Sequence, residues 1–251
     1  MPPDKWYLPS IRGRLHLGAM AQEPVHIDLV VNLTPSEQFA GSTVVQDRNF
    51  GVLLPSARVF SEIDWGGASF SVAFLDISRR RVTYRQENMP GIDWSKAAGS
   101  LANINAGVID AKSLEQRQYN AEFFLNQIRR RVRPVRGDAR GRPRALIVLS
   151  ASFQFQNAQQ VHPITFDTSG SDRAPRVFYI RYQPAARLYF GPPDRPGHPP
   201  LGPTVAGRGN VPGLDQLEPL LKPLEPRLFD VATPDQFRKA LAGILAEIAK
   251  L

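Results

Sequence analysis

The segment Pro24-Val25-His26-Ile27-Asp28-Leu29-Val30-Val31-Asn32-Leu33-Thr34-Pro35-Ser36 decides how this sequence folds. Its centre is a nearly continuous apolar run, which is typical of a buried parallel strand. The run ends in three oxygen-bearing side chains at alternate positions, those of Asn32, Thr34 and Ser36. Open α/β sheets bind ligands at the carboxyl ends of their strands. The segment therefore predicts a buried strand over residues 25–33, with a candidate binding site just past its end.

The composition excludes several classes of protein. The chain has 251 residues, 42% of them hydrophobic and 22% charged, and it contains no cysteine. Disulfides, thiolate metal sites and cysteine nucleophiles are therefore excluded. No run of about 18 apolar residues occurs, so the sequence predicts no membrane-spanning helix. The first 23 residues lack the apolar stretch of a signal peptide, so we expect a cytoplasmic protein on the chain as given, or an exported one if a signal was removed before Met1.

The rest of the chain alternates between apolar strands and amphipathic helices, which is typical of α/β folds. We expect an irregular arm over residues 1–23 and one domain over residues 24–251. After the first strand, further strands are expected over residues 69–77, 81–86, 145–149, 176–182 and 227–231. Helices are expected over residues 47–63, 112–132 and 214–224, and from residue 233 to the C-terminus. Proline and glycine are so frequent in residues 184–213 that we expect an extended surface excursion there.

Two local sequence patterns predict structure more specifically than the alternation of apolar strands and amphipathic helices does. Only residues 78–80 separate the second and third strands, so these strands should form an antiparallel hairpin. Thr233, Pro234 and Gln236 have the spacing of a capping box, with proline at the first helical position. The sequence therefore predicts where the last helix begins.

The order of these elements resembles the von Willebrand factor A domain over residues 24–251. Val25–Ser36 resembles the first strand of that family with its metal motif, and Ser69–Gln86 resembles the second strand and the antiparallel third strand. Arg144–Ser152 is similar to the strand that ends in Thr-Asp-Gly. The resemblance implies a three-layer α/β/α sandwich of Rossmann-like type. Its central sheet would be mostly parallel, with one antiparallel edge strand.

In that family, a metal ion lies at the carboxyl edge of the sheet. Its ligands come from a D-x-S-x-S motif, from a threonine before a mid-chain helix, and from the aspartate of Thr-Asp-Gly. In this sequence the matching positions are occupied by Asn32, Thr34 and Ser36, by the region of Asp110, and by Ser150, Ala151 and Ser152. Magnesium depends on carboxylate ligands, and both matching carboxylates are absent here. We therefore expect neither a metal ion nor another cofactor at this edge, unless Asp110 supplies a charge.

The resemblance implies a non-catalytic module that binds a protein partner through the carboxyl edge. The candidate contact residues are Asn32, Thr34, Ser36, Ser150 and Ser152. No G-x-S-x-G elbow, phosphate loop or G-x-G-x-x-G motif is present, and the four histidines have no metal-ligand spacing. We therefore expect no enzymatic activity. Asp28 precedes apolar residues, so we interpret it as a structural hydrogen-bond acceptor.

The alternative function is polyanion binding, because the formal net charge is +8 and much of it lies in one stretch. That stretch contains Arg129, Arg130, Arg131, Arg133, Arg136, Arg140, Arg142 and Arg144. Its simpler interpretation is a solvated helix end and loop, with cations placed favourably at the helix C-terminus. No aromatic residues are interleaved there for base stacking. Nucleic acid is therefore a less favoured partner than protein.

Overall fold

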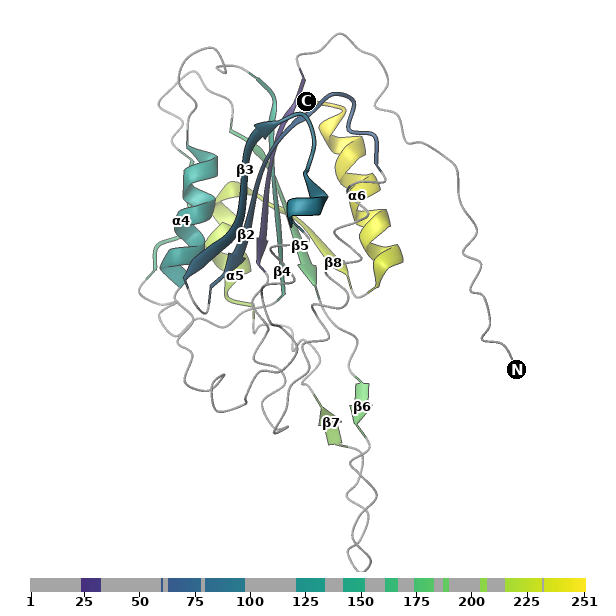
Figure 1. Ribbon diagram of the computed structural model, residues 1–251. Helices are drawn as coiled ribbons and strands as arrows, with labels where there is room; N and C mark the ends of the chain where they lie inside the picture. Colours follow the sequence, from purple (N-terminus) through teal and green to yellow (C-terminus); the bar gives the residue numbers. More distant parts are fainter. Residues whose placement is uncertain are drawn as a thin grey trace, which may run out of the picture.

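A six-stranded sheet forms the centre of the molecule (Figure 1). The computed structural model describes residues 24–32, 60, 63–77, 80–97, 121–133, 142–151, 161–166, 174–182, 187–189, 204–206, 215–231 and 233–251. The strands are β1 (His26–Asn32), β2 (Ser69–Asp76), β3 (Arg81–Met89), β4 (Arg144–Ala151), β5 (Arg176–Tyr182) and β8 (Arg227–Val231). Their order is β3-β2-β1-β4-β5-β8. Only β3 runs antiparallel to its neighbour, so the predicted mostly parallel sheet with one antiparallel edge strand is confirmed.

Helices cover both faces of this sheet (Figure 1). On one face lie α4 (Ala121–Val132) and the short α5 (Leu217–Leu221), which continues into a 3-10 turn (Lys222–Leu224). On the other face lies α6 (Pro234–Ile248). Successive side chains of a strand point to opposite faces, and the core is divided accordingly. Ile27 and Leu29 of β1 belong to the apolar cluster that contains α6, whereas Val30 belongs to the cluster with α4 and α5.

The start of α6 is the capping box that the sequence predicts. The Gln236 backbone N–H donates to Thr233 Oγ1 over 3.3 Å, and the Thr233 N–H donates to Gln236 Oε1 over 3.2 Å. Pro234 occupies the first turn, where its missing N–H costs nothing. The helix then buries Phe237, Leu241 and the rest of its apolar stripe against the sheet.

The third strand is longer than the sequence predicts. It runs to Met89 instead of ending at Gln86, with irregular pairing between β2 and β3. The added residues Glu87 and Asn88 are exposed, and an edge strand of an antiparallel pair tolerates such polar positions. Their polarity is why an apolar pattern does not reveal them.

Several expected elements lie outside the described residues. These are the arm over residues 1–23, nearly all of the helix over 47–63, and the first part of the helix over 112–132. The excursion over residues 184–213 contains a small antiparallel ribbon, β6 (Arg187–Tyr189) with β7 (Thr204–Ala206), which the sequence did not predict. This ribbon lies apart from the main sheet (Figure 1). Among the described helices, none is long and apolar enough to span a membrane.

Candidate functional site

The carboxyl edge of the sheet brings together two of the predicted site residues. Asn32 ends β1 and Ser150 lies near the end of the neighbouring β4. The Asn32 Nδ2 amide donates a hydrogen bond to Ser150 Oγ over 3.0 Å, and both side chains are buried. A neutral amide at the position of the family's first ligand aspartate therefore contacts the hydroxyl of the residue just before Ala151, where the family pattern has its second ligand aspartate.

Of the other candidates at this edge, only Ala151 belongs to the described residues. Ala151 is the last residue of β4. Thr34, Ser36, Asp110 and Ser152 lie outside the described residues. Within the part of the chain that the structure describes, no three His, Asp or Glu side chains are grouped to hold a metal ion.

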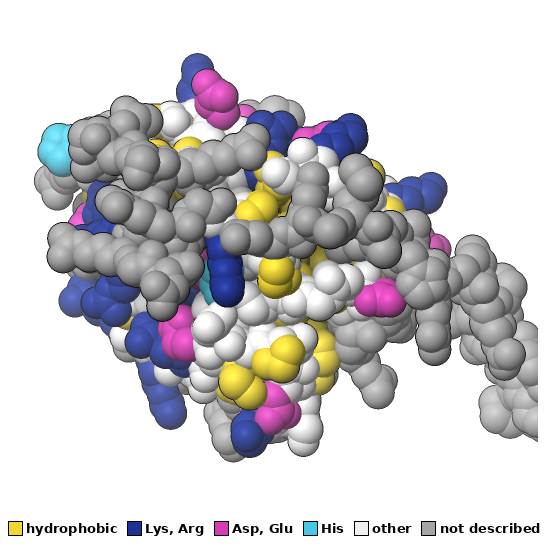
Figure 2. All heavy atoms as spheres, turned by 90° about the horizontal axis from the view of Figure 1, so that it is seen from above, with side chains coloured by type: hydrophobic (Ala, Val, Ile, Leu, Met, Phe, Trp, Pro, Cys, Tyr) yellow, Lys and Arg dark blue, Asp and Glu magenta, His cyan; other side chains and the backbone are white. Residues whose placement is uncertain are grey.

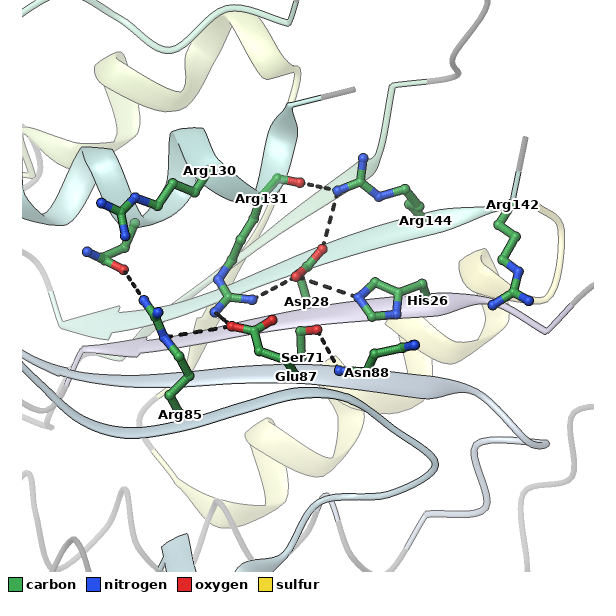
Figure 3. A pocket seen from close by; sticks show the side chains of 11 residues that line it. His26, Asp28, Ser71, Arg85, Glu87, Asn88, Arg130, Arg131, Arg142 and Arg144 are labelled. Atoms are coloured by element: carbon green, nitrogen blue, oxygen red, sulfur yellow. Dashed lines mark hydrogen bonds and ion pairs between the residues drawn. The ribbon is translucent and has the colours of Figure 1, made fainter. Parts of the chain in front are cut away.

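A second candidate site lies at the opposite, amino edge of the sheet, as a cavity of about 460 Å³ (Figure 3). Seen from above in Figure 2, Lys and Arg side chains gather at this end of the molecule, on the side where α4 lies in Figure 1. The cavity is lined by charged and polar side chains from the three strands β1, β2 and β3, from α4 and from the start of β4. They are His26, Asp28, Ser71, Arg85, Glu87, Asn88, Gln127, Arg130, Arg131, Arg142 and Arg144.

Asp28 is the central carboxylate of this cavity, with 4% of its surface exposed. Arg131 Nη1 donates to Asp28 Oδ1 over 2.7 Å, and Arg144 Nη2 lies 3.5 Å from Oδ2. His26 Nε2 is 3.8 Å from Oδ1, while His26 Nδ1 is 2.8 Å from Ser69 Oγ. Burial alone would raise the pKa of Asp28, but the contact with His26 and the charge of Arg131 outweigh burial and lower it. Asp28 is therefore a structural acceptor, as the sequence suggests.

Arg144 joins the end of α4 to the sheet. Its Nη1 donates to the Arg133 carbonyl over 2.9 Å, and its Nη2 donates to the Arg131 carbonyl. These carbonyls lie at the negative end of the helix dipole, where a cation is favourable. The Nε atom of Arg144, by contrast, is buried and has no hydrogen-bond partner among the residues that the structure describes.

The wall opposite α4 comes from β2 and β3. Arg85 Nε lies 3.7 Å from Glu87 Oε1, and Arg85 Nη2 donates to Gln127 Oε1 over 3.4 Å. Asn88, which has a positive φ of 48°, donates its backbone N–H to Ser71 Oγ over 3.0 Å. Asparagine tolerates this left-handed conformation better than most residues, so it suits the irregularly paired end of β3 at this wall.

The predicted solvated arginine stretch is wrong for two of its members. Arg131 and Arg144 have side chains only 7% and 9% exposed, and both pair with Asp28. Arg129 pairs with Glu122 over 2.6 Å and donates to the His162 carbonyl. Exposed positions of the stretch in the described chain are Arg130 and Arg133, and Arg142 is half-buried. Arg136 and Arg140 lie outside the described residues.

Sequence reasoning missed most of the amino-edge cavity. One signal was available: Arg131 follows Phe124 and Ile128 at intervals of four and three residues, so it continues the apolar face of α4. A charged residue at such a position needs a buried partner, and Asp28 within an apolar strand is the matching carboxylate. No comparable signal marks Arg85 or Asn88, because their place follows from the pairing of β3 with β2.

A third polar cluster is centred on Arg181 of β5. Arg181 contacts Asp230 over 2.6 and 3.0 Å, Glu218 over 2.9 Å and Asp215 over 3.2 Å. These bonds, that to Asp230 first, raise the pKa of Arg181. Burial raises the pKa of Asp215, although it accepts hydrogen bonds from Leu217 N–H, Tyr179 and Arg181. The cluster links β5, β8 and α5, because the single Arg181 guanidinium contacts all three carboxylates.

Comparisons with known proteins concern the fold alone. No protein-family model matches the chain, and no curated protein matches its sequence. A conserved hypothetical protein BatB from Bacteroides thetaiotaomicron is similar in structure, with a TM-score of 0.47 and 14% identity, over 90% of this chain and 100% of that one. A von Willebrand factor type A structure from Catenulispora acidiphila has a TM-score of 0.42 and 12% identity, over 91% of this chain and 43% of that one. The strand order, the single antiparallel edge strand and the helices on both faces make the fold von Willebrand factor A-like.

Proposed function

We propose that this chain is a non-catalytic protein-binding module whose carboxyl edge engages its partner without a divalent ion. The observation that carries the proposal is the direct hydrogen bond between Asn32 and Ser150. In the family that the sequence resembles, a ligand aspartate stands at the position of Asn32 and another at the position after Ser150. In this chain those positions hold an amide and Ala151, and the Asn32 amide is hydrogen-bonded to the Ser150 hydroxyl.

The roles of the residues at this edge then differ with their burial. Asn32 and Ser150 are 1% and 0% exposed, so they fasten the ends of β1 and β4 and do not themselves touch a partner. The partner would contact the residues that follow these strands, Thr34 and Ser36 after β1 and Ser152 after β4. Magnesium binding leans on carboxylate charge, and the Asn32–Ser150 pair offers none.

Polyanion binding through the whole Arg129–Arg144 stretch has less support. Arg129, Arg131 and Arg144 are engaged with carboxylates or backbone carbonyls. The described arginines of this stretch therefore present no continuous row to a long polymer. The salt dependence of binding distinguishes polyanion binding from protein binding. Counterion release makes the affinity for a polyanion fall steeply as the salt concentration rises.

The test is an affinity capture of partners by the purified chain, compared among three proteins. These are the wild type, the variant Thr34→Arg/Ser36→Arg at the carboxyl edge, and the control Met89→Arg, an exposed position at the amino edge. We expect a protein captured by the wild type and the control to be lost from the carboxyl-edge variant, and its capture to be unchanged by a chelator.

Calorimetric titration with magnesium and manganese completes this test. We expect no heat of binding at micromolar affinity for the wild type. A micromolar signal abolished by Asn32→Ala or Asp110→Ala would show that the edge still binds an ion. Capture that depends on the added metal would likewise contradict the proposal.

A further inference from the structure

The amino-edge cavity carries more positive charge than its own carboxylates neutralise. Five arginines line it, against the two carboxylates Asp28 and Glu87, which leaves an excess of three positive charges when His26 is neutral. Cations that share a cavity repel one another, and a bound anion relieves this repulsion. The question is which of the arginines remain available to such an anion.

The ion pairs of the cavity leave two arginines unused. Asp28 is occupied by Arg131 and Arg144, while Glu87 lies within 4 Å of Arg85 and Arg131. Arg130 and Arg142 form no hydrogen bond or ion pair with any described residue. Figure 3 shows them on opposite sides of Asp28, one on α4 and the other just before β4. They therefore flank the cavity from two directions.

Two residues that line the cavity have a further donor group with no acceptor among the described residues. The buried Nε of Arg144 has no hydrogen-bond partner in the described part of the chain, which is rare for a buried polar atom in a folded protein. The hydroxyl of Ser71 accepts a hydrogen bond from the Asn88 N–H, so its own hydrogen remains free to be donated. Both observations call for an acceptor that the described protein residues do not supply.

We propose that the amino-edge cavity is a binding site for a small anion that carries phosphate or carboxylate groups. Guanidinium groups match both anions through paired N–H donors. The cavity volume of about 460 Å³ lies within the range of small-molecule sites, about 300–1,000 Å³. Asp28 does not repel the ligand strongly, because two arginines already neutralise it. The site lies at the opposite edge of the sheet from the proposed partner site and does not depend on it.

Isothermal titration calorimetry with inorganic phosphate, pyrophosphate and citrate at constant ionic strength tests the proposal. We expect saturable one-to-one binding of at least one of them, and the three probes distinguish phosphate from carboxylate ligands. Arg130→Gln and Arg142→Gln should each weaken binding by about tenfold. Arg133→Gln is the matched control, because it removes the same charge from the same end of α4 but does not line the cavity. Its affinity should equal that of the wild type.

A variant that removes a negative charge from the cavity shows whether weaker binding reflects lost charge and not damage to the fold. Glu87→Gln removes an exposed carboxylate from the cavity wall, so it should tighten anion binding, which simple damage to the fold would not do. The proposal is overturned if none of the three probes binds, or if Arg133→Gln weakens binding as much as Arg130→Gln. It is also overturned if only long heparin or DNA binds, with an affinity that grows with polymer length, since that would indicate a surface for polyanions.

Discussion

At the scale of single residues, Asp28 and Arg131 show what a sequence can and cannot reveal. The acceptor role of Asp28 could be predicted, because a carboxylate inside an apolar strand needs hydrogen bonds. Its partner could not, since Arg131 is 103 residues away and sits among other arginines that suggest a solvated helix end. Only the fold brings the C-terminus of α4 over the first residues of β1.

Removing one partner of this buried pair should destabilise the protein strongly. Asp28→Asn leaves the Arg131 and Arg144 guanidinium groups without their carboxylate, so we expect the free energy of unfolding to fall by about 3–5 kcal/mol. Arg131→Met should cost a similar amount, and the double variant less than the sum. Urea unfolding at pH 7 measures these changes, with Arg133→Gln within about 0.5 kcal/mol as the control. A loss below about 1 kcal/mol for Asp28→Asn would mean that the pair is not buried as described.

At the scale of elements, prediction worked best where the signal is local. The capping box of α6 is contained within four residues. The strands β1, β2 and β5 can be recognised from their runs of apolar residues. The end of β3 could not be predicted, because its last residues are polar and are held by pairing with β2. The family pattern assigns Asn32 and Ser150 to the same edge as candidate partner contacts, whereas their mutual hydrogen bond and their burial depend on packing.

The cap and the body of α6 should contribute very different amounts of stability. Thr233→Ala removes a side chain that accepts from the Gln236 N–H, so we expect a loss of about 1 kcal/mol in the free energy of unfolding. Lys239→Ala, an exposed position on the same helix, should change it by less than about 0.5 kcal/mol. Truncation after Val231 removes the apolar stripe and should give an unfolded or insoluble chain. A soluble truncated protein with an unchanged melting transition would show that α6 is peripheral.

At the scale of the whole molecule, two buried carboxylates respond to pH with opposite signs. The pKa of Asp28 is lowered by folding, so its stabilising contribution is present above its unfolded value of about 3.9 and is lost as the pH falls below that value. The pKa of Asp215 is raised by burial, so its contribution is greatest below about 3.9 and declines as the pH rises through the folded value.

These opposite signs can be separated by mutation. Between about pH 5 and pH 3, we expect the urea midpoint of Asp28→Asn to fall less than that of the wild type, because the variant has no Asp28 contribution left to lose. The midpoint of Asp215→Asn should fall more steeply, because the compensating protonation of Asp215 is gone. Identical slopes for all three proteins would contradict the assignment of these carboxylates as the opposing groups.

Because β1 pairs with β4, part of the sheet can form only late during synthesis of the chain. Asn32 and its hydrogen-bond partner Ser150 are 118 residues apart in the chain. A ribosome that adds about 5–20 residues per second needs about 6–24 s to make that interval. During this time β1 can pair at most with β2, once residues 69–76 have been made, and its other edge keeps unpaired hydrogen-bonding groups of the kind that promote aggregation. A strand at the centre of the finished sheet is thus an edge strand in the nascent chain until β4 emerges.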